Sequence, residues 1–252
     1  MIELALFLIF MALIMEIVDS SLGMFYGTLL SPLLIIFGFE PLLVIPAILI
    51  SQAIGGISGT FFHHRFKNAD FNGLTRDTKV AFLMAIPGLI AVVIGALIAV
   101  SVPPVILKTY IGVLVIIMSL FCLSKFKFMF KWWKHSIIGA MASFNKVLTG
   151  GGFGPLTSTG GIIAGLDPRA SIATTTYAEV LICLASFVLY VILYGLSNPL
   201  FIILIPNLCI GALIGGMIGP YISNKINQKK LRRFVAVIGI VSGVWILVKI
   251  II

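Results

Sequence analysis

Apolar runs of about twenty residues recur along the whole chain, and this feature leaves few folds open. A run of that length is what an α-helix needs to cross the hydrocarbon core of a bilayer. Of the 252 residues, 60% are hydrophobic and 10% are charged, which leaves no room for a soluble domain. The pattern predicts an all-α polytopic membrane protein. The first fifteen letters, "MIELALFLIFMALIM", lack a basic segment and a cleavage site, so we expect no removable signal peptide.

The basic residues are concentrated in three segments. The chain carries a net charge of +9, and thirteen of its 17 lysines and arginines fall into three clusters. These are Arg65, Lys67, Arg76 and Lys79; Lys125, Lys127, Lys131 and Lys134; and Lys225, Lys229, Lys230, Arg232 and Arg233. Such clusters are typical of cytoplasmic loops, so the charge orients the protein and predicts no nucleic-acid partner.

The chain also repeats itself. "GFEP" at 38–41 matches "GLDP" at 165–168 at an offset of 127, which also pairs Gly23 with Gly150 and Gln52 with Glu179. A second match, between segments starting at 88 and 212, has an offset of 124. We interpret this as a duplication, with repeats over 1–124 and 135–252 joined by a basic cytoplasmic linker, 125–134. Chance resemblance between apolar segments is the alternative.

The loop charges predict that the duplication is inverted. If the basic clusters lie inside, span 80–102 runs outward and span 104–124 returns, whereas span 199–222 runs inward and span 231–250 outward. Equivalent spans then point in opposite directions, the arrangement of many secondary transporters. The same reasoning places both termini outside. The isoleucine-rich composition and the compactness of the chain indicate a prokaryotic plasma membrane.

Each half begins with a segment that is too short to cross the membrane. Residues 28–37 and 156–163 offer about eight to twelve helical residues, against the roughly twenty that a crossing needs. We therefore expect a re-entrant or discontinuous helical hairpin followed by three transmembrane helices in each half, 8–10 helical segments in total. Two full crossings per hairpin, giving ten helices, is the alternative.

The hairpin tips, "VDSSLGMFYG" at 18–27 and "NKVLTGGGFG" at 145–154, combine glycine with polar residues. Glycine permits backbone N–H groups to form an anion-binding nest, and the start of the helix that follows carries positive partial charge. Close packing of helices is the competing explanation for glycine in membrane segments. The candidate anion-binding residues are Gly150, Gly151, Gly152, Gly154, Thr157, Ser158, Lys146, Asn145, Gly23, Gly27, Thr28 and Ser31.

Ionisable residues within apolar spans are costly and indicate function by default. Glu16, Asp19, Lys146 and Glu179 are such residues. Asp19 and Lys146 are equivalent positions of the two tips, and we consider a pair between them, of either structural or functional role. Glu179 is equivalent to an amide residue, Gln52, in the other half, and a carboxylate in one half with an amide in the other is what a proton-titrating site would look like. Glu179, Gln52, Asp19 and Tyr177 are therefore the candidates for proton coupling, with a fixed hydrogen-bond network as the alternative.

Other chemistry receives little support. The three cysteines are isolated, and the His63–His64 pair has no third ligand nearby in the sequence, so we expect no metal and no cofactor. We find no nucleophile–base constellation for an intramembrane enzyme and no G-x-x-x-x-G-K-[ST] for ATP hydrolysis.

The paired Gly-rich tips, each followed by a Gly-x-acidic-Pro connection and a span rich in small and hydroxyl residues, resemble the sulfite exporter TauE/SafE family of membrane transporters. The resemblance covers essentially the whole chain. The residues that match the repeated pattern are Gly23, Gly27, Gly150, Gly151, Gly152, Gly154, Pro41 and Pro168, although the first tip is poorer in glycine. The resemblance implies export or uptake of small sulfur-containing or related organic anions, such as sulfite or sulfonates.

The function that we expect is therefore secondary anion transport, by alternating access and driven by an ion gradient, with H⁺ as the coupling ion. An anion channel that uses the same hairpins is the alternative, and homodimer formation is left open.

Overall fold

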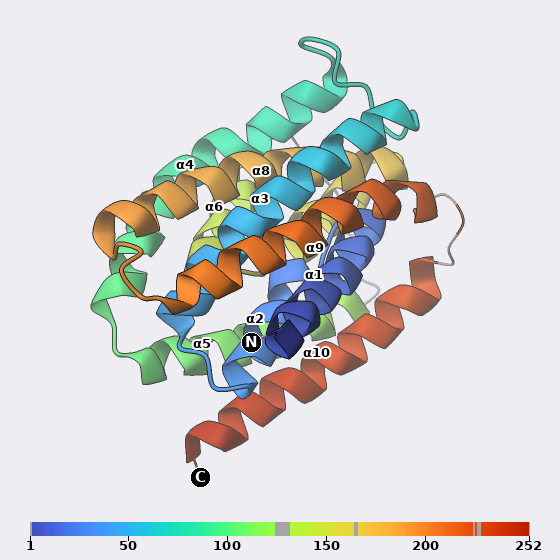
Figure 1. Cartoon of the computed structure of the whole chain (residues 1–252). Helices are drawn as coiled ribbons and strands as arrows, with labels where there is room; N and C mark the ends of the chain where they lie inside the picture. The colour runs from blue at the N-terminus through green and yellow to red at the C-terminus, as the bar shows by residue number, and fades with distance from the viewer. Residues whose placement is uncertain (1, 124–131, 164–165, 224, 226–227, 252) are drawn as a thin grey trace.

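The computed structural model consists of helices and their connections and describes every residue except 1, 124–131, 164–165, 224, 226–227 and 252. Ten helices lie within the described part of the chain (Figure 1). The first five are α1 (Ile2–Leu22), α2 (Tyr26–Ile36), α3 (Pro41–Arg65), α4 (Arg76–Ser101) and α5 (Pro104–Leu123). The second five are α6 (Trp132–Thr149), α7 (Phe153–Ile163), α8 (Pro168–Leu193), α9 (Leu200–Ile222) and α10 (Gln228–Ile251). The all-helical prediction is confirmed.

The helices begin and end where the sequence supplies breaks. α3 and α8 both start at the proline of the Gly-x-acidic-Pro connection, a residue suited to the first helical position. The Asp167 carboxylate caps α8 by accepting from the N–H groups of Arg169 and Ala170 at 3.0 and 3.4 Å. Glu40, its counterpart, instead pairs with Lys108 of α5 at 3.2 Å. The repeated motif thus marks two equivalent helix starts.

α2 and α7 are short, as predicted. Each has 11 residues, which at about 1.5 Å per residue gives roughly half of a bilayer core. Four other helices among the described residues, α3, α4, α8 and α9, are long and apolar enough to cross a membrane. α2 and α7 are therefore too short for the full crossings that the ten-helix alternative requires.

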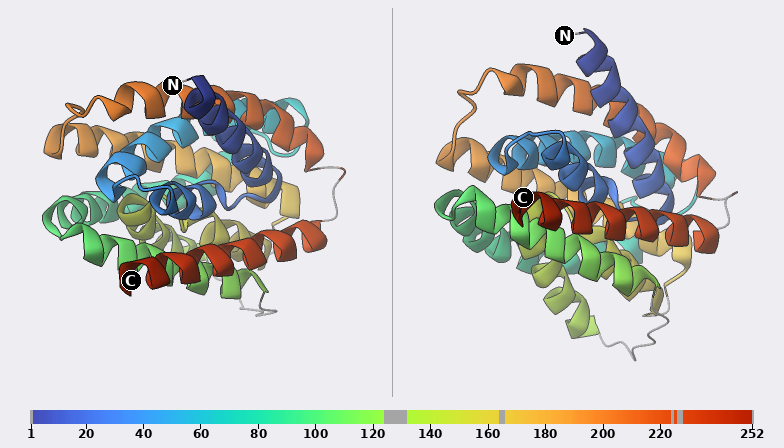
Figure 2. Two further views of the ribbon diagram at one scale, coloured as in Figure 1. Left: turned by 60° about the horizontal axis from the view of Figure 1, so that its bottom comes forward. Right: turned by 90° about the horizontal axis from the view of Figure 1, so that it is seen from below.

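Helices from the two halves of the chain pack against each other. α1 packs on α9, α6 on α4, α3 on α8 and α5 on α10, and α10 runs beside α5 in both views of Figure 2. Gly95 lies against Val147, and Gly219 against Ser20. These two contacts are equivalent in the repeat, since the offset of 124 pairs Gly95 with Gly219 and the offset of 127 pairs Ser20 with Val147.

Successive contacts along the helices also give their relative directions. α3 and α8 run antiparallel, because Gly56 lies near Val180 whereas Gly59, further along α3, lies near Thr176. α3 runs parallel to α9, with Gly55 near Ala212 and Gly59 near Gly216. α4 runs parallel to α8, since Phe82 packs on Tyr177 and Gly88 lies beside Ile182. α4 and α9 therefore point in opposite directions.

The connections of the bundle gather at two ends. Residues 66–75, which connect α3 to α4 and lie between Arg65 and Arg76 of the first basic cluster, are at one end of the bundle (Figure 1). The connections from α4 to α5 and from α8 to α9, together with the C-terminus, stand at the other. We call the former the basic end. Lys125, Lys127 and Lys131 lie outside the described residues, as do the side chains of Lys134, Lys229, Lys230 and Arg232.

Candidate functional site

The two hairpin tips share one backbone conformation. Gly23 and Phe25 have φ angles of 70° and 100°, and Gly150 and Gly152 have φ angles of 74° and 84°. The offset of 127 aligns the first pair with the second. Glycine is the residue that adopts positive φ without strain. The first tip is poorer in glycine because a buried phenylalanine, Phe25, occupies a position that the second tip gives to Gly152.

The two tips touch through their backbones. A Cβ atom on Gly27 would lie 1.5 Å from the carbonyl oxygen of Gly150, and one on Gly154 would lie 2.3 Å from that of Gly23. These contacts are again exchanged by the offset of 127. A Cβ on Gly151 would lie 2.5 Å from the backbone nitrogen of Thr28. Close packing is therefore one reason for these glycines, alongside the anion binding that we expected.

The amide groups of the glycine run have partners inside the protein. The N–H of Gly150 donates to the Lys146 carbonyl at 2.8 Å, and that of Gly151 to Thr149 Oγ1 at 3.1 Å. The N–H of Gly152 donates to Thr28 Oγ1 at 3.0 Å, so Thr28 serves as an acceptor in this conformation. By helix geometry the N–H groups of Phe153 and Gly154 at the start of α7 have no intrahelical acceptor, and Pro155 has no N–H.

The neighbouring hydroxyl and amide side chains also lie close to the tips. Thr157 and Ser158 donate to the carbonyls of Phe153 and Gly154, at 2.9 and 2.8 Å. Asn145 Oδ1 accepts from the Tyr110 hydroxyl at 2.6 Å. Ser31 is fully buried, and its hydroxyl has no hydrogen-bond partner among the described residues.

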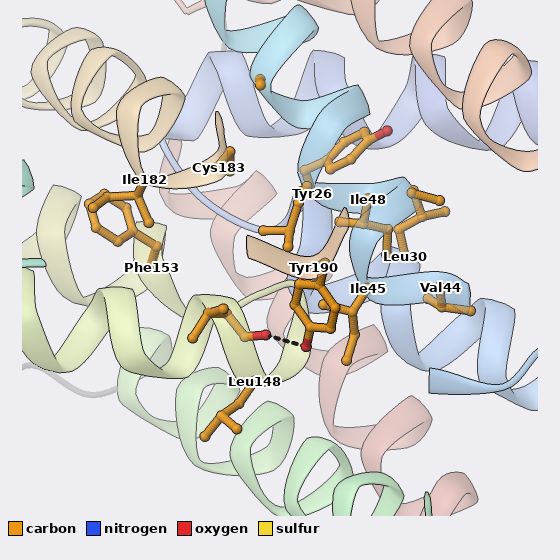
Figure 3. Close-up of a cluster of buried hydrophobic side chains, with 14 of the residues drawn as sticks. Tyr26, Leu30, Val44, Ile45, Ile48, Leu148, Phe153, Ile182, Cys183 and Tyr190 are labelled. Atoms are coloured by element: carbon orange, nitrogen blue, oxygen red, sulfur yellow. Dashed lines mark hydrogen bonds between the residues drawn. The ribbon is translucent and has the colours of Figure 1, made fainter. Parts of the chain in front are cut away.

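A packed apolar core holds the tips in place. Tyr26 and Phe153 are equivalent by the offset of 127, and both side chains are fully buried (Figure 3). The Tyr190 hydroxyl donates to the carbonyl oxygen of Val147 at 2.8 Å, which ties α8 to the last turns of α6 (Figure 3). The polar tips are thus surrounded by side chains that exclude water.

Buried charged side chains meet beside the tips. The Lys146 ammonium lies 2.8 Å from Glu179 Oε1 and also donates to the side-chain oxygen of Gln52. The Gln52 amide in turn donates to Asp19 Oδ2 at 3.3 Å, and Asp19 Oδ1 accepts from the backbone N–H of Tyr26 at 2.8 Å. All four residues of this network are at most 4% exposed. Lys146 thus pairs with Glu179 and reaches Asp19 through Gln52, instead of pairing with Asp19 directly.

The two short helices, α2 and α7, differ in the charged residue that precedes their N-termini. The carboxylate of Asp19 caps the N-terminus of α2 through Tyr26 N–H, where the helix dipole favours negative charge. At the equivalent position beside α7 the chain has Lys146. The start of α2 therefore has a built-in anion, whereas the residue equivalent to Asp19 in the second half is a lysine, whose ammonium pairs with Glu179.

Tyr177 lies outside the network. Its half-buried ring packs on Phe71 and Phe82, with ring centroids 5.0 and 6.0 Å away. Two residues along an α-helix turn the side chain by about 200°, so Tyr177 and Glu179 face different sides of α8. A proton-coupling role for Tyr177 therefore stays a prediction that the network does not include. Conversely, the network includes the backbone amide of Tyr26, which no feature of the sequence singles out.

Two described cavities lie away from the tips. One of 240 Å³ is bordered by Ile35, Gly38, Lys108 and Lys249, and one of 320 Å³ by His64, Lys67, Asp70 and Asp77. Neither is lined by a residue of the charged network.

Comparison with known proteins gives two matches. A family model described as sulfite exporter TauE/SafE matches residues 8–246. The chain is also 25% identical over 234 residues to "Probable membrane transporter protein YtnM" of Bacillus subtilis (strain 168), covering 87% of this chain and 75% of that protein. No solved structure matches.

Proposed function

Because the chain belongs to the sulfite exporter TauE/SafE family of membrane transporters, we propose that it moves small sulfur-containing or organic anions, such as sulfite or sulfonates, by gradient-driven secondary transport. Export is the direction that the family description suggests. We place the chain in a prokaryotic plasma membrane as a multi-pass protein with both termini outside. The relative from Bacillus subtilis is described as a transporter without a stated substrate, so the substrate class rests on the family and on the site.

The observation that carries the proposal is the difference between the two helix starts. Asp19 supplies α2 with a carboxylate, whereas α7 has Lys146 at the matching place. A helix N-terminus beside an ammonium group favours a negatively charged ligand. We propose that the transported anion binds there, against the first N–H groups of α7, in the position that the Asp19 carboxylate occupies at α2. Gly150–Gly154 allow the close approach of backbone that this position requires.

Coupling to protons follows from the ion pair between Lys146 and Glu179. In this conformation the Lys146 ammonium forms an ion pair with Glu179 Oε1 at 2.8 Å. A proton arriving at Glu179 would neutralise it and release the Lys146 charge for the anion. Gln52 and Asp19 keep Lys146 oriented during the exchange. Competition between the carboxylate and the anion for one buried ammonium thus links proton movement to anion movement.

Alternating access is supported by the helix directions. α3 and α8 are equivalent by the offset of 127 and run antiparallel, and α4 and α9, equivalent by the offset of 124, also point in opposite directions. Inverted repeats of this kind allow one half of a transporter to take up the conformation of the other, which exposes a central site to each side in turn. A homodimer is compatible with this scheme but is not required by it.

Transport into proteoliposomes tests the proposal. Wild-type protein should accumulate radiolabelled sulfite when a pH gradient is imposed, and a sulfonate, whose charge does not change near neutral pH, should behave alike. Glu179→Gln should retain anion exchange and lose gradient-driven accumulation, whereas Lys225→Gln, at an exposed residue, should match wild type. Unchanged accumulation in Glu179→Gln would remove Glu179 from the coupling. Downhill flux that no gradient reverses would favour the anion channel.

The role of Lys146 is tested in the same liposomes without leaving a charge unpaired. Lys146→Gln/Glu179→Gln is compared with Glu179→Gln alone, so that only the ammonium group differs. The double variant should need at least a tenfold higher sulfite concentration for half-maximal exchange. Equal concentrations in the two variants would place the anion elsewhere.

A further inference from the structure

A fourth buried ionisable residue, Glu16, lies in a slot walled by backbone. Its side chain in α1 is 1% exposed. A Cβ on Gly55 of α3 would lie 2.7 Å from the Glu16 carboxyl carbon, and a Cβ on Gly215 of α9 would lie 2.6 Å from Glu16 Cβ. Glycine at both positions thus leaves room for the Glu16 side chain between the three helices.

The Glu16 carboxyl is the least satisfied of the three buried carboxyls. Glu16 Oε1 accepts from the Ser20 hydroxyl at 2.7 Å, but Oε2 is buried and has no hydrogen-bond partner among the described residues. By contrast, Asp19 accepts from two donors and Glu179 faces an ammonium. A buried carboxylate oxygen without a donor is strongly unfavourable, and such a group becomes neutral by binding a proton instead.

The charges around Glu16 favour the neutral form as well. The titratable groups of the surrounding helices are Asp19 on α1, Tyr26 on α2, His63 on α3, Lys146 on α6, Glu179 and Cys183 on α8, and Cys209 on α9. If ionised, Glu16 would be the third carboxylate around a single ammonium, and the cluster would carry two net negative charges. With Glu16 neutral, the cluster carries one net negative charge. The N-terminus of α2 stabilises this charge, because the Tyr26 N–H donates to the Asp19 carboxylate.

We propose that Glu16 is a proton-binding site of this transporter and holds a proton on Oε2 while Lys146 is paired with Glu179. Its role in coupling rests on the proposed function, whereas its protonation does not. When the proton leaves, it passes to water, the Glu16 carboxylate remains, and no other bond is broken. Glu16 thereby stores the coupling proton in the part of the cycle in which Glu179 is occupied.

Polar groups lead from Glu16 toward the basic end of the bundle. Ser20 donates to Glu16, and its backbone lies beside the buried ring of His63. His63 Nδ1 is 3.0 Å from the side-chain nitrogen of Asn68, in the connection that follows α3. The position equivalent to Glu16 in the second half is Ser143, whose hydroxyl donates to the Gly139 carbonyl at 2.7 Å. The proton-binding site therefore belongs to the first half alone.

Infrared spectroscopy of the purified protein at neutral pH tests the protonation without any transported substrate. A protonated carboxyl has a C=O stretching band that an ionised carboxylate lacks. This band should disappear in Glu16→Gln and persist in Glu179→Gln and Asp19→Asn. Ser20→Ala retains the carboxyl but removes its hydrogen-bond donor, so the band should move to higher frequency. A band unchanged in Glu16→Gln would overturn the proposal.

Proteoliposome assays then test the coupling role. Glu16→Gln should keep sulfite exchange within about twofold of wild type and lose accumulation driven by the pH gradient. Retained accumulation in Glu16→Gln would refute the coupling role while leaving the proposed function intact. Absence of any transport by wild-type protein would contradict the proposed function and the coupling role, and the infrared band would still decide whether Glu16 is protonated. A size-exclusion profile identical to wild type shows that the variant is folded.

Discussion

A single methyl group has no room at the point where the two hairpin tips meet. Around Gly27, Gly151 and Gly154 the nearest neighbours are backbone atoms of the opposite tip, which cannot move aside as a flexible side chain would. The tips therefore depend on glycine for their mutual packing whatever ligand they bind. A loss of transport in a glycine-to-alanine variant of these residues would not by itself identify the anion site, which is why Lys146 and Glu179 are the better probes.

Gly27→Ala is expected to prevent the tips from packing. The added Cβ would lie 1.5 Å from the Gly150 carbonyl oxygen, so the two backbones must separate. We predict a loss of most folded protein, seen as aggregation on size-exclusion chromatography in detergent. Gly38→Ala is the matched control, because its φ of 99° is strained for alanine but its Cβ meets nothing within 4 Å. The free energy of unfolding of the control should fall by only about 1 kcal/mol, and the control should remain folded. Equal behaviour of the two variants would contradict the packing argument.

At the scale of helices, α2 and α7 have the same length and tip conformation but different charges at their N-termini. The Asp19 carboxylate satisfies the first N–H of α2, as an N-cap side chain does in a soluble protein. Because the Tyr26 N–H is buried, removal of its acceptor should destabilise the protein more than it would at a water-exposed helix start.

Asp19→Ala should therefore destabilise the protein by about 1–3 kcal/mol, since the Tyr26 N–H would lack its acceptor. Asp19→Asn keeps an acceptor oxygen and should lose less. Thermal unfolding in detergent measures both, and added formate should raise the melting temperature of the alanine variant by occupying the vacated place. Indifference of Asp19→Ala to formate, with chloride as the control anion, would argue against anion binding at these helix starts.

Much of this arrangement of elements is predictable from the sequence, and the exceptions have physical reasons. Hydropathy and the prolines at 41, 104 and 168 indicate the helix boundaries, because they act locally. The second tip is visible as a glycine run, and the first as two separate glycines beside polar residues. The partner of Lys146 is not predictable in this way, since the direction of a long side chain depends on how α3, α6 and α8 pack. Likewise the Glu16 slot requires Gly215, which lies almost two hundred residues away.

At the scale of the whole molecule, the bundle has a basic end and an opposite end. The connection 66–75 lies at the former and the connection between α8 and α9 at the latter (Figure 1). Basic residues beside transmembrane helices stay on the cytoplasmic side during insertion. The basic end should therefore face the cytoplasm, and the inverted repeats should place the starts of α3 and α8 on opposite sides of the membrane.

Cysteine labelling in intact cells tests this orientation. The chain has three cysteines, which are first replaced by serine or alanine. Asn72→Cys and Ser197→Cys then place single thiols at exposed residues of the two ends. A membrane-impermeant maleimide added outside should label Ser197→Cys within minutes and should label Asn72→Cys only after the cells are opened. The reverse result would invert the orientation while leaving the repeats intact. Labelling of both thiols from outside would mean that residues 66–75 and 194–199 lie on one side of the membrane. The number of membrane crossings between them would then have to be revised for α4, α5 and the second hairpin with α8.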